Sequence, residues 1–248
     1  MSTRLPTPVA GKNASPAVLA DYFQRSKLPL PTLLVLLPVI ALVEFGFGLA
    51  PDSAATRVLA TVRLRDLLQA FTLSPAVVVH GLGVIVILVL LTWHVLDGDR
   101  WRVRLMDLPI MLFEGCMASV PLLVAAAALL SQHAMPLGAA AGDHTQLEAV
   151  LIAATAALSE EFLFRMCGIA LLHLVLVDLF RFKHALGMTI AVILTAVAFT
   201  MYHDPSTLAP TAVTFYAVSG LYLGGLFAMR GLAPAVLAHA VYNIIALV

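Results

Sequence analysis

The chain has 248 residues, of which 61% are apolar and 11% are charged, and its formal net charge is zero at pH 7. Because a soluble domain carries about 25% charged residues, this composition excludes an ordinary soluble protein. The lack of net charge gives no reason to expect a nucleic-acid partner. The two cysteines, Cys116 and Cys167, lie in separate apolar stretches without a CxxC pattern, so we expect reduced thiols rather than a disulfide or a metal site.

The chain begins with a polar N-terminal tail, residues 1–26, which contains three prolines and no early apolar run. We therefore expect no cleaved signal peptide, and we expect the first apolar stretch to direct insertion into the membrane. Residues 27–248 are predicted to form one transmembrane helical domain.

Seven apolar stretches are each about as long as the roughly 20 residues that a helix needs to cross the hydrocarbon core of a bilayer. They lack the alternation typical of barrel strands, so the predicted fold class is all-α, a polytopic transmembrane helical bundle. The predicted spans are residues 28–50, 75–95, 108–131, 147–172, 185–203, 210–229 and 231–248. In the sixth span, Gly220 and Gly224 have the GxxxG spacing that lets two helices approach closely, and we expect a packing role for them.

Residues 52–74 carry apolar side chains at helical spacing with arginines between them. This pattern is typical of an amphipathic helix that lies on the membrane surface.

The distribution of lysine and arginine predicts the orientation of the multi-pass chain. With the N-terminus inside, the inner segments hold ten of these residues, the outer segments hold three, and Arg165 lies within a span. The inner ones are Arg4, Lys12, Arg25, Lys27, Arg100, Arg102, Arg104, Arg181, Lys183 and Arg230. The sequence therefore predicts an integral membrane protein with a cytoplasmic N-terminus.

Ionisable side chains gather within the predicted fourth span, where each costs about 2.5–3.5 kcal/mol on insertion scales and usually serves function. Glu161 and Arg165 are four residues apart, on one helical face and in the favourable order for an ion pair. That pairing leaves Glu160 free to face the bundle interior as a general base. The alternative is a structural Glu–Arg cluster that ties helices together.

Three further polar residues follow in the fifth and seventh predicted spans. His203 ends the fifth predicted span, and His239 and Asn243 share one face of the seventh. An imidazole and an amide on one face could donate hydrogen bonds to a developing oxyanion; the alternatives are an interfacial histidine and interhelical hydrogen bonding. The predicted topology places Glu160 at mid-membrane and His203 near the outer surface. We therefore expect them to meet only if the fifth helix is short, bent or preceded by a long inner segment.

The three groups of polar residues form an ordered set, EEFLFR at 160–165, FTMYH at 199–203 and HAVYN at 239–243. The set resembles the motifs EExxxR, FxxxH and HxxxN of the CPBP intramembrane proteases, the family of type II CAAX prenyl proteases and bacteriocin-processing Abi proteins. The resemblance covers about residues 145–248. It implies an intramembrane endopeptidase in which Glu160 and His203 activate the attacking water. Glu161 and Arg165 would orient the site, and His239 and Asn243 would stabilise the oxyanion.

The resemblance leaves the cofactor open, because the family has been described both as metalloproteases and as glutamate proteases without metal. Glu160, His203 and His239 could supply three Zn²⁺ ligands, but no HExxH pairing fixes two ligands on one helical face. We therefore favour catalysis without a metal or other cofactor. The expected partners are a membrane-associated protein or peptide substrate and the lipid bilayer. The alternative functions are a membrane transporter or proton relay that uses the buried Glu and His groups, and a non-catalytic scaffold or immunity protein.

Overall fold

The computed structural model describes residues 16–49, 75–130 and 145–247, and every regular element in these ranges is helical. The all-α prediction is therefore confirmed for this part of the chain. The amphipathic helix predicted at 52–74 lies outside it. In chain order the elements are α1 (Pro16–Arg25), α2 (Pro29–Leu49), α4 (Pro75–Asp97), α5 (Asp107–Met117), α6 (Val120–Leu130), α7 (Gln146–Glu160), η3 (Glu161–Ile169), α8 (Ala170–His173), η4 (Leu174–Leu179), α9 (His184–Tyr202), η5 (Pro205–Thr207), α10 (Pro210–Arg230) and α11 (Leu232–Leu247).

Five helical segments of the described chain are long and apolar enough to cross a membrane, which makes the chain an integral membrane protein. They are Pro29–Gly46, Asp107–Leu130, Gln146–Leu179, His184–Tyr202 and Pro210–Arg230. The other two predicted spans correspond to α4, whose part Gly81–Asp97 is apolar, and to the 16-residue helix α11 (Leu232–Leu247); neither is among the five, so the count of seven spans is not confirmed. In α11 every residue from Leu232 to Ala240 is buried. Its apolar side chains therefore pack inside the protein. Hydropathy alone does not distinguish such a buried helix from one that crosses the membrane in contact with lipid.

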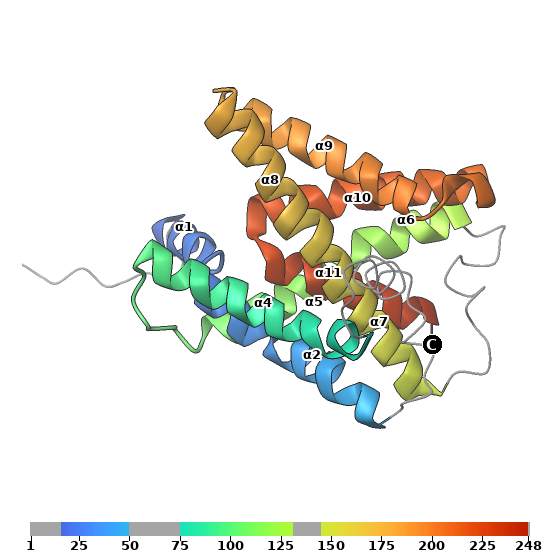
Figure 1. Ribbon diagram of the computed structural model, residues 1–248, viewed down its shortest axis with the longest axis horizontal. Coiled ribbons are helices and arrows are strands. Elements are labelled where there is room, and N and C mark those ends of the chain that lie inside the picture. Colours follow the sequence, from blue (N-terminus) through green and yellow to red (C-terminus); the bar gives the residue numbers. More distant parts are fainter. Residues whose placement is uncertain (1–15, 50–74, 131–144, 248) are drawn as a thin grey trace, which may run out of the picture.

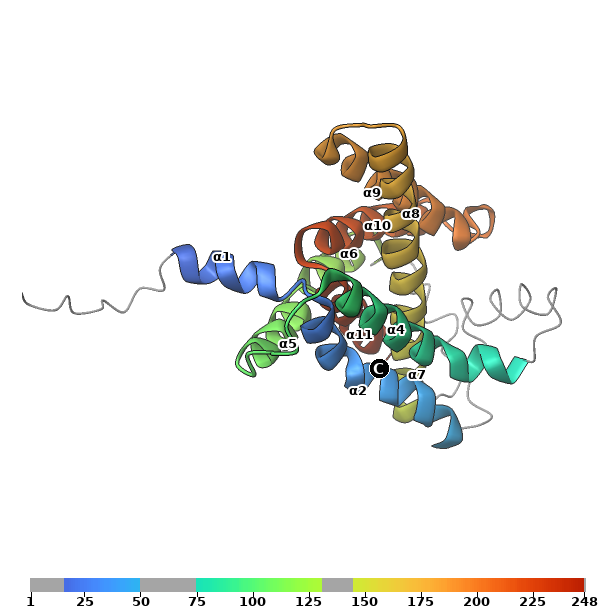
Figure 2. The ribbon, with the colours of Figure 1, turned by 60° about the vertical axis from the view of Figure 1, so that its left-hand side comes forward.

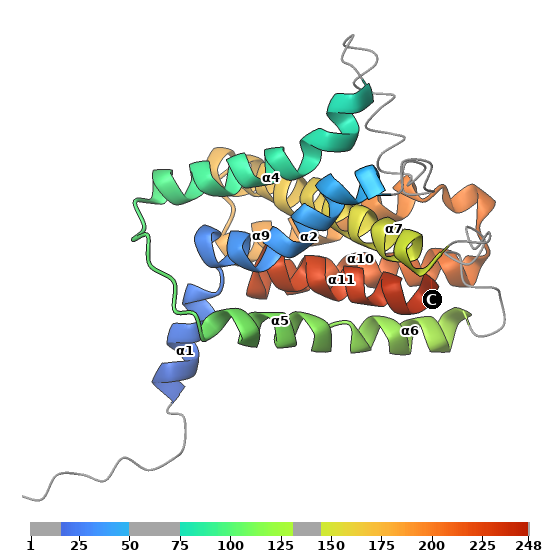
Figure 3. The ribbon, with the colours of Figure 1, turned by 90° about the horizontal axis from the view of Figure 1, so that it is seen from below.

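Helices α7 and α11 form the centre of the bundle. Every residue from Leu151 to Glu161 is buried, so α7 is enclosed on all its faces from Leu151 onward, while its first turn is exposed. In Figure 1 the continuous helix from α7 to η4 runs diagonally through the molecule, between α2 and α4 on one side and α9 and α10 on the other. Figure 3 shows α5 and α6 end to end beside α11, and Figure 2 shows α1 extending away from the bundle.

Local sequence signals explain two of the helix boundaries. At the start of α7, the Thr145 hydroxyl accepts a hydrogen bond from the Glu148 amide at 3.3 Å, and the Glu148 carboxylate accepts one from the Thr145 amide at 2.9 Å. This capping box satisfies two amide groups at the helix terminus. The break between α5 and α6 precedes Pro121, which has no N–H to donate to the Met117 carbonyl.

Helices α9 and α10 pack closely because two glycines lie between them. A Cβ atom at Gly220 would lie 3.1 Å from the Ala196 Cα atom, and one at Gly224 would lie 3.0 Å from Val192 Cγ1. The GxxxG pair of the sixth predicted span thus lies at a helix–helix interface, where larger side chains would push the helices apart.

We expect Gly220→Val to lower the free energy of unfolding by about 1–3 kcal/mol, the usual loss on overpacking. The matched control is Gly225→Val on the same helix, because a Cβ atom at Gly225 meets nothing within 4 Å. Thermal unfolding of both variants in detergent micelles would measure the difference. Equal midpoints for the two variants would contradict the close contact at Gly220.

Candidate active site

The polar residues of the three motifs converge although they lie on three different helices, α7–η3, α9 and α11. The fourth apolar helix extends to Leu179, beyond the end predicted at residue 172. Glu160 lies 19 residues before that end, and His203 lies 19 residues after the start of the returning helix α9 at His184. The two residues therefore reach the same level. The expected mismatch in depth is resolved by a longer fourth helix, and α9 keeps 19 residues.

The carboxylate of Glu160 lies between two imidazole rings. Its Oε1 atom is 4.0 Å from Nε2 of His203, and its Oε2 atom is 3.8 Å from Nε2 of His239. Glu160 is only 5% exposed. Both separations exceed a hydrogen bond, and they suit a small molecule such as water that bridges the groups.

The Nδ1 atom of His203 lies 2.8 Å from the backbone carbonyl oxygen of Phe199. Because a carbonyl oxygen only accepts hydrogen bonds, Nδ1 carries the proton and donates. In the neutral ring the lone pair is therefore on Nε2, which is the nitrogen that faces Glu160.

His239 is held by the buried Glu161–Arg165 ion pair. Nδ1 of His239 lies 2.8 Å from Oε1 of Glu161, and the same oxygen lies 3.0 Å from Nη1 of Arg165. Glu161 and Arg165 are 0% and 1% exposed. Glu161 therefore connects Arg165 to His239 and turns Nε2 of His239 toward Glu160. Asn243 lies one turn further along α11 and is also buried.

Two aromatic residues that were not predicted as site residues complete the cluster. The guanidinium carbon of Arg165 lies 4.5 Å from the ring centroid of Phe199, a cation–π contact that stabilises a cation away from water. Phe199 was recognised only as part of a motif. Tyr216 of α10 stacks on His203, with ring centroids 4.0 Å apart and planes 19° apart. Tyr216 lies in no recognised motif, and no sequence signal distinguishes it from a packing aromatic.

The helix changes its geometry at the site. Residues Glu161–Ile169 are π-helical, directly after Glu160 ends α7. Such segments are rare and occur frequently at functional sites. The wider turn begins where Glu160 and Glu161 direct their carboxylates to different partners.

The donors of the zinc alternative are Glu160, His203 and His239. Zinc ligands lie about 2.0–2.2 Å from the ion, in a tetrahedral arrangement. Within the described ranges, no group of three His, Cys, Asp or Glu side chains is arranged to hold a metal ion.

A second polar network lies around α1, at the junction of α5 and the end of α10. Arg230 forms an ion pair with Glu114 and donates to the Ser26 hydroxyl at 3.0 Å. The Tyr22 hydroxyl donates to Glu114 at 2.8 Å. Burial, helped by this hydrogen bond, raises the pKa of Tyr22 above its usual value, so the phenol stays protonated as a donor. This network attaches α1 to the bundle.

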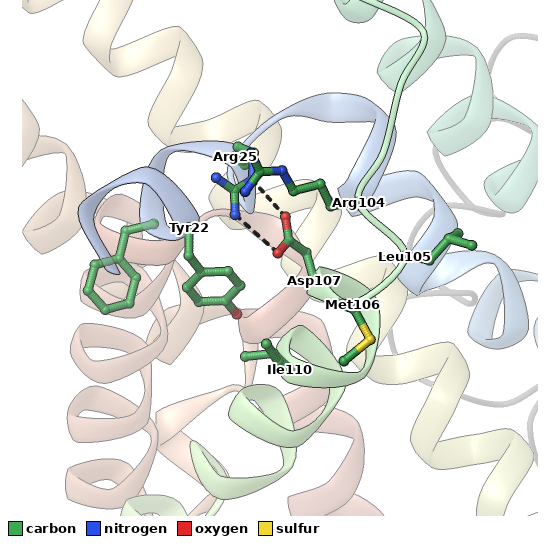
Figure 4. Close-up of a pocket in the computed structure, with 8 residues that line it drawn as sticks. Tyr22, Arg25, Arg104, Leu105, Met106, Asp107 and Ile110 are labelled. Atoms are coloured by element: carbon green, nitrogen blue, oxygen red, sulfur yellow. Dashed lines mark hydrogen bonds and ion pairs between the residues drawn. The ribbon is translucent and has the colours of Figure 1, made fainter. Parts of the chain in front are cut away.

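A cavity of about 710 Å³ lies beside this network, lined by residues of α1 and by the segment that leads into α5 (Figure 4). Its charged residues form ion pairs with neighbouring side chains, Arg25 with Asp107 at 2.8 Å and Arg104 with Asp21 at 3.6 Å. None of its lining residues belongs to the three motifs. The cavity is therefore separate from the Glu160 cluster and has no unpaired charge to select a ligand.

Comparison with known families gives one finding. Residues 143–245 match the family model described as type II CAAX prenyl endopeptidase, Rce1-like. The matched segment contains all three motifs. No curated protein and no solved structure matches the chain.

We expect Arg165→Met to lower the free energy of unfolding by about 3–5 kcal/mol, because it leaves a buried carboxylate without its cation. Adding Glu161→Gln removes the unpaired charge, so the double variant should recover much of the loss. Unfolding midpoints of the wild type and both variants in one detergent would measure this. A double variant less stable than Arg165→Met would contradict the buried ion pair.

Proposed function

Because residues 143–245 belong to the type II CAAX prenyl endopeptidase family, we propose that this chain is an intramembrane endopeptidase that uses Glu160 to activate water. The observation that carries the proposal is the buried Glu160 carboxylate, with an imidazole Nε2 atom 3.8–4.0 Å from each of its oxygens. A water molecule between Glu160 and His203 would have the carboxylate as a base on one side and Nε2 of His203 as a second proton acceptor on the other. This is the arrangement that general base catalysis needs.

The reaction follows from the positions of the protons. Glu160, with His203 beside it, takes a proton from the water, and the hydroxide attacks the carbonyl carbon of the scissile bond. Nε2 of protonated His239 and the amide of Asn243 donate hydrogen bonds to the oxygen that becomes negative. The proton from the water then passes to the leaving nitrogen as the carbon–nitrogen bond breaks.

The charges of the cluster support a protonated His239. Glu160, Glu161 and Arg165 are buried together, and two carboxylates with one guanidinium leave a net negative charge in a medium that opposes it. One additional proton neutralises the cluster. His239 is well placed to carry it, because its Nδ1 donates to Glu161 and its Nε2 faces Glu160.

The proposed substrate is a membrane-associated protein or peptide, and the family name supports one with a prenylated CAAX end. The proposed N-terminal side is cytoplasmic. Residues of three predicted inner segments, Arg25, Arg104 and Arg230, lie together around α1, which supports their placement on one side of the membrane.

We expect Glu160→Gln to abolish cleavage while the protein remains folded, because an amide cannot accept the proton from water at neutral pH. The measurement compares protein termini in membrane and secreted fractions of cells carrying the wild type or the variant. Glu148→Gln is a matched control on the same helix, since glutamine also serves in a capping box.

A terminus present with the wild type and Glu148→Gln, but absent with Glu160→Gln, would identify the substrate. Identical termini in all samples, with each protein folded and the substrate expressed, would favour the transporter or scaffold alternatives.

We propose that catalysis is of the glutamate type, without a metal. Purified wild type should then retain its cleavage rate after dialysis against a zinc chelator, with less than one zinc ion bound per ten chains. Loss of the rate on chelation and its return with added Zn²⁺ would instead establish the alternative in which Glu160, His203 and His239 hold zinc.

A further inference from the structure

His203 lies at a position where its own helix constrains it weakly. It follows the last residue of α9, and Asp204 after it adopts a left-handed conformation with φ of 50°. Nδ1 of the His203 ring donates a hydrogen bond to the carbonyl oxygen of Phe199. One such bond holds a single ring atom and lets the ring pivot, so it does not by itself determine the direction of Nε2.

Three aromatic rings surround the imidazole, but only one of them stacks on its face. The rings of Phe199 and Tyr202 belong to α9 itself and meet His203 at 63° and 85°. Tyr216 comes from α10 and lies nearly parallel to the imidazole, with planes 19° apart and centroids 4.0 Å apart. A stacked ring blocks rotation of the imidazole out of its plane, which edge contacts resist less.

The backbone geometry of α10 brings Tyr216 to this position. Gly220 and Gly224 follow Tyr216 by one and two helical turns on the same face, and they contact Ala196 and Val192 of α9. Because α9 and α10 run in opposite directions, this line of contacts continues from Gly220 and Ala196 to Tyr216 and His203. The close approach of the two helices therefore sets the distance between the two rings.

We propose that Tyr216 is a positioning residue for His203. Its ring holds the imidazole plane so that Nε2 faces Oε1 of Glu160, 4.0 Å away. This role depends on the proposed function of His203 in activating water. The aromatic face carries the role, and the phenolic hydroxyl is not needed.

Two substitutions separate the ring from the hydroxyl. Tyr216→Phe keeps the stacked ring, so kcat should stay within about twofold of the wild type. Tyr216→Leu removes the ring, and kcat should fall about 10–100-fold, because a displacement near 1 Å at a reacting group can lower the rate about 100-fold. KM should change by less than about threefold, since substrate binding is not affected. The measurement is cleavage kinetics of purified protein on the substrate identified from its termini.

The control for general damage to α10 is Tyr222→Leu. Tyr222 lies on the same helix and donates to the carbonyl oxygen of Ala118 at 2.7 Å, away from His203. We expect Tyr222→Leu to lower the unfolding temperature and leave kcat of the folded fraction unchanged. A fall in kcat as large as that of Tyr216→Leu would overturn the positioning role.

A second measurement does not depend on activity. In NMR spectra of protein labelled at histidine, the stacked phenol shields the ring protons of His203, so Tyr216→Leu should move their signals downfield and Tyr216→Phe should not. Unchanged signals in Tyr216→Leu would overturn the stacking.

In the kinetic experiment, full kcat in Tyr216→Leu, or a Tyr216→Phe variant as slow as Tyr216→Leu, would overturn the positioning role. Absence of cleavage by the wild type would instead overturn the proposed function, and the NMR result would still report on the stack.

Discussion

The burial of charge in the middle of an apolar helix is the constraint on which the bundle depends. Arg165 and Glu161 are almost completely excluded from solvent, and a charge in such a place is tolerated only when it is paired and hydrogen-bonded. The surrounding helices meet this demand in part, because Oε2 of Glu161 and both Nη atoms of Arg165 are buried without a hydrogen-bond partner among the described residues. Glu161 compensates Arg165 within the helix, Phe199 covers the guanidinium from α9, and His239 donates from α11. The enclosure of α7 from Leu151 onward follows from the same need, because lipid offers a charge no partner.

The same contacts connect stability to chemistry. Phe199 contacts both the Arg165 cation and the His203 ring, so the aromatic residue of the FxxxH motif joins the structural pair to the histidine beside the proposed base, Glu160. Glu161 likewise contacts both Arg165 and His239 through its Oε1 atom. A substitution in the ion pair would therefore disturb the orientation of both histidines. Stability and activity at this site are expected to fall together, except for changes to Glu160 itself, which faces the histidines rather than Arg165.

The helical pattern and the Glu161–Arg165 pair could be predicted from the sequence, because hydrophobic blocks and a spacing of four residues depend on local geometry alone. The length of the fourth helix could not, since His173 and Asp178 interrupt its apolar pattern before the helix ends at Leu179. The burial of α11 could also not be predicted, because an apolar helix inside a protein and one in lipid have the same composition. Tyr216 contacts His203 on another helix, and a single sequence contains no sign of that pairing.

The continuous helix from Gln146 to Leu179 has 34 residues, and at the α-helical rise of about 1.5 Å per residue it would be at most about 50 Å long, since its π-helical part rises less. A hydrocarbon core is about 30 Å thick, so this helix is subject to hydrophobic mismatch and must tilt or project beyond the core. Its diagonal course through the bundle in Figure 1 agrees with a tilt. Because Glu160 is carried by this helix, the thickness of the bilayer influences how deep the carboxylate lies in the membrane. In membranes of different thickness, the carboxylate would therefore meet a substrate chain at different points along that chain.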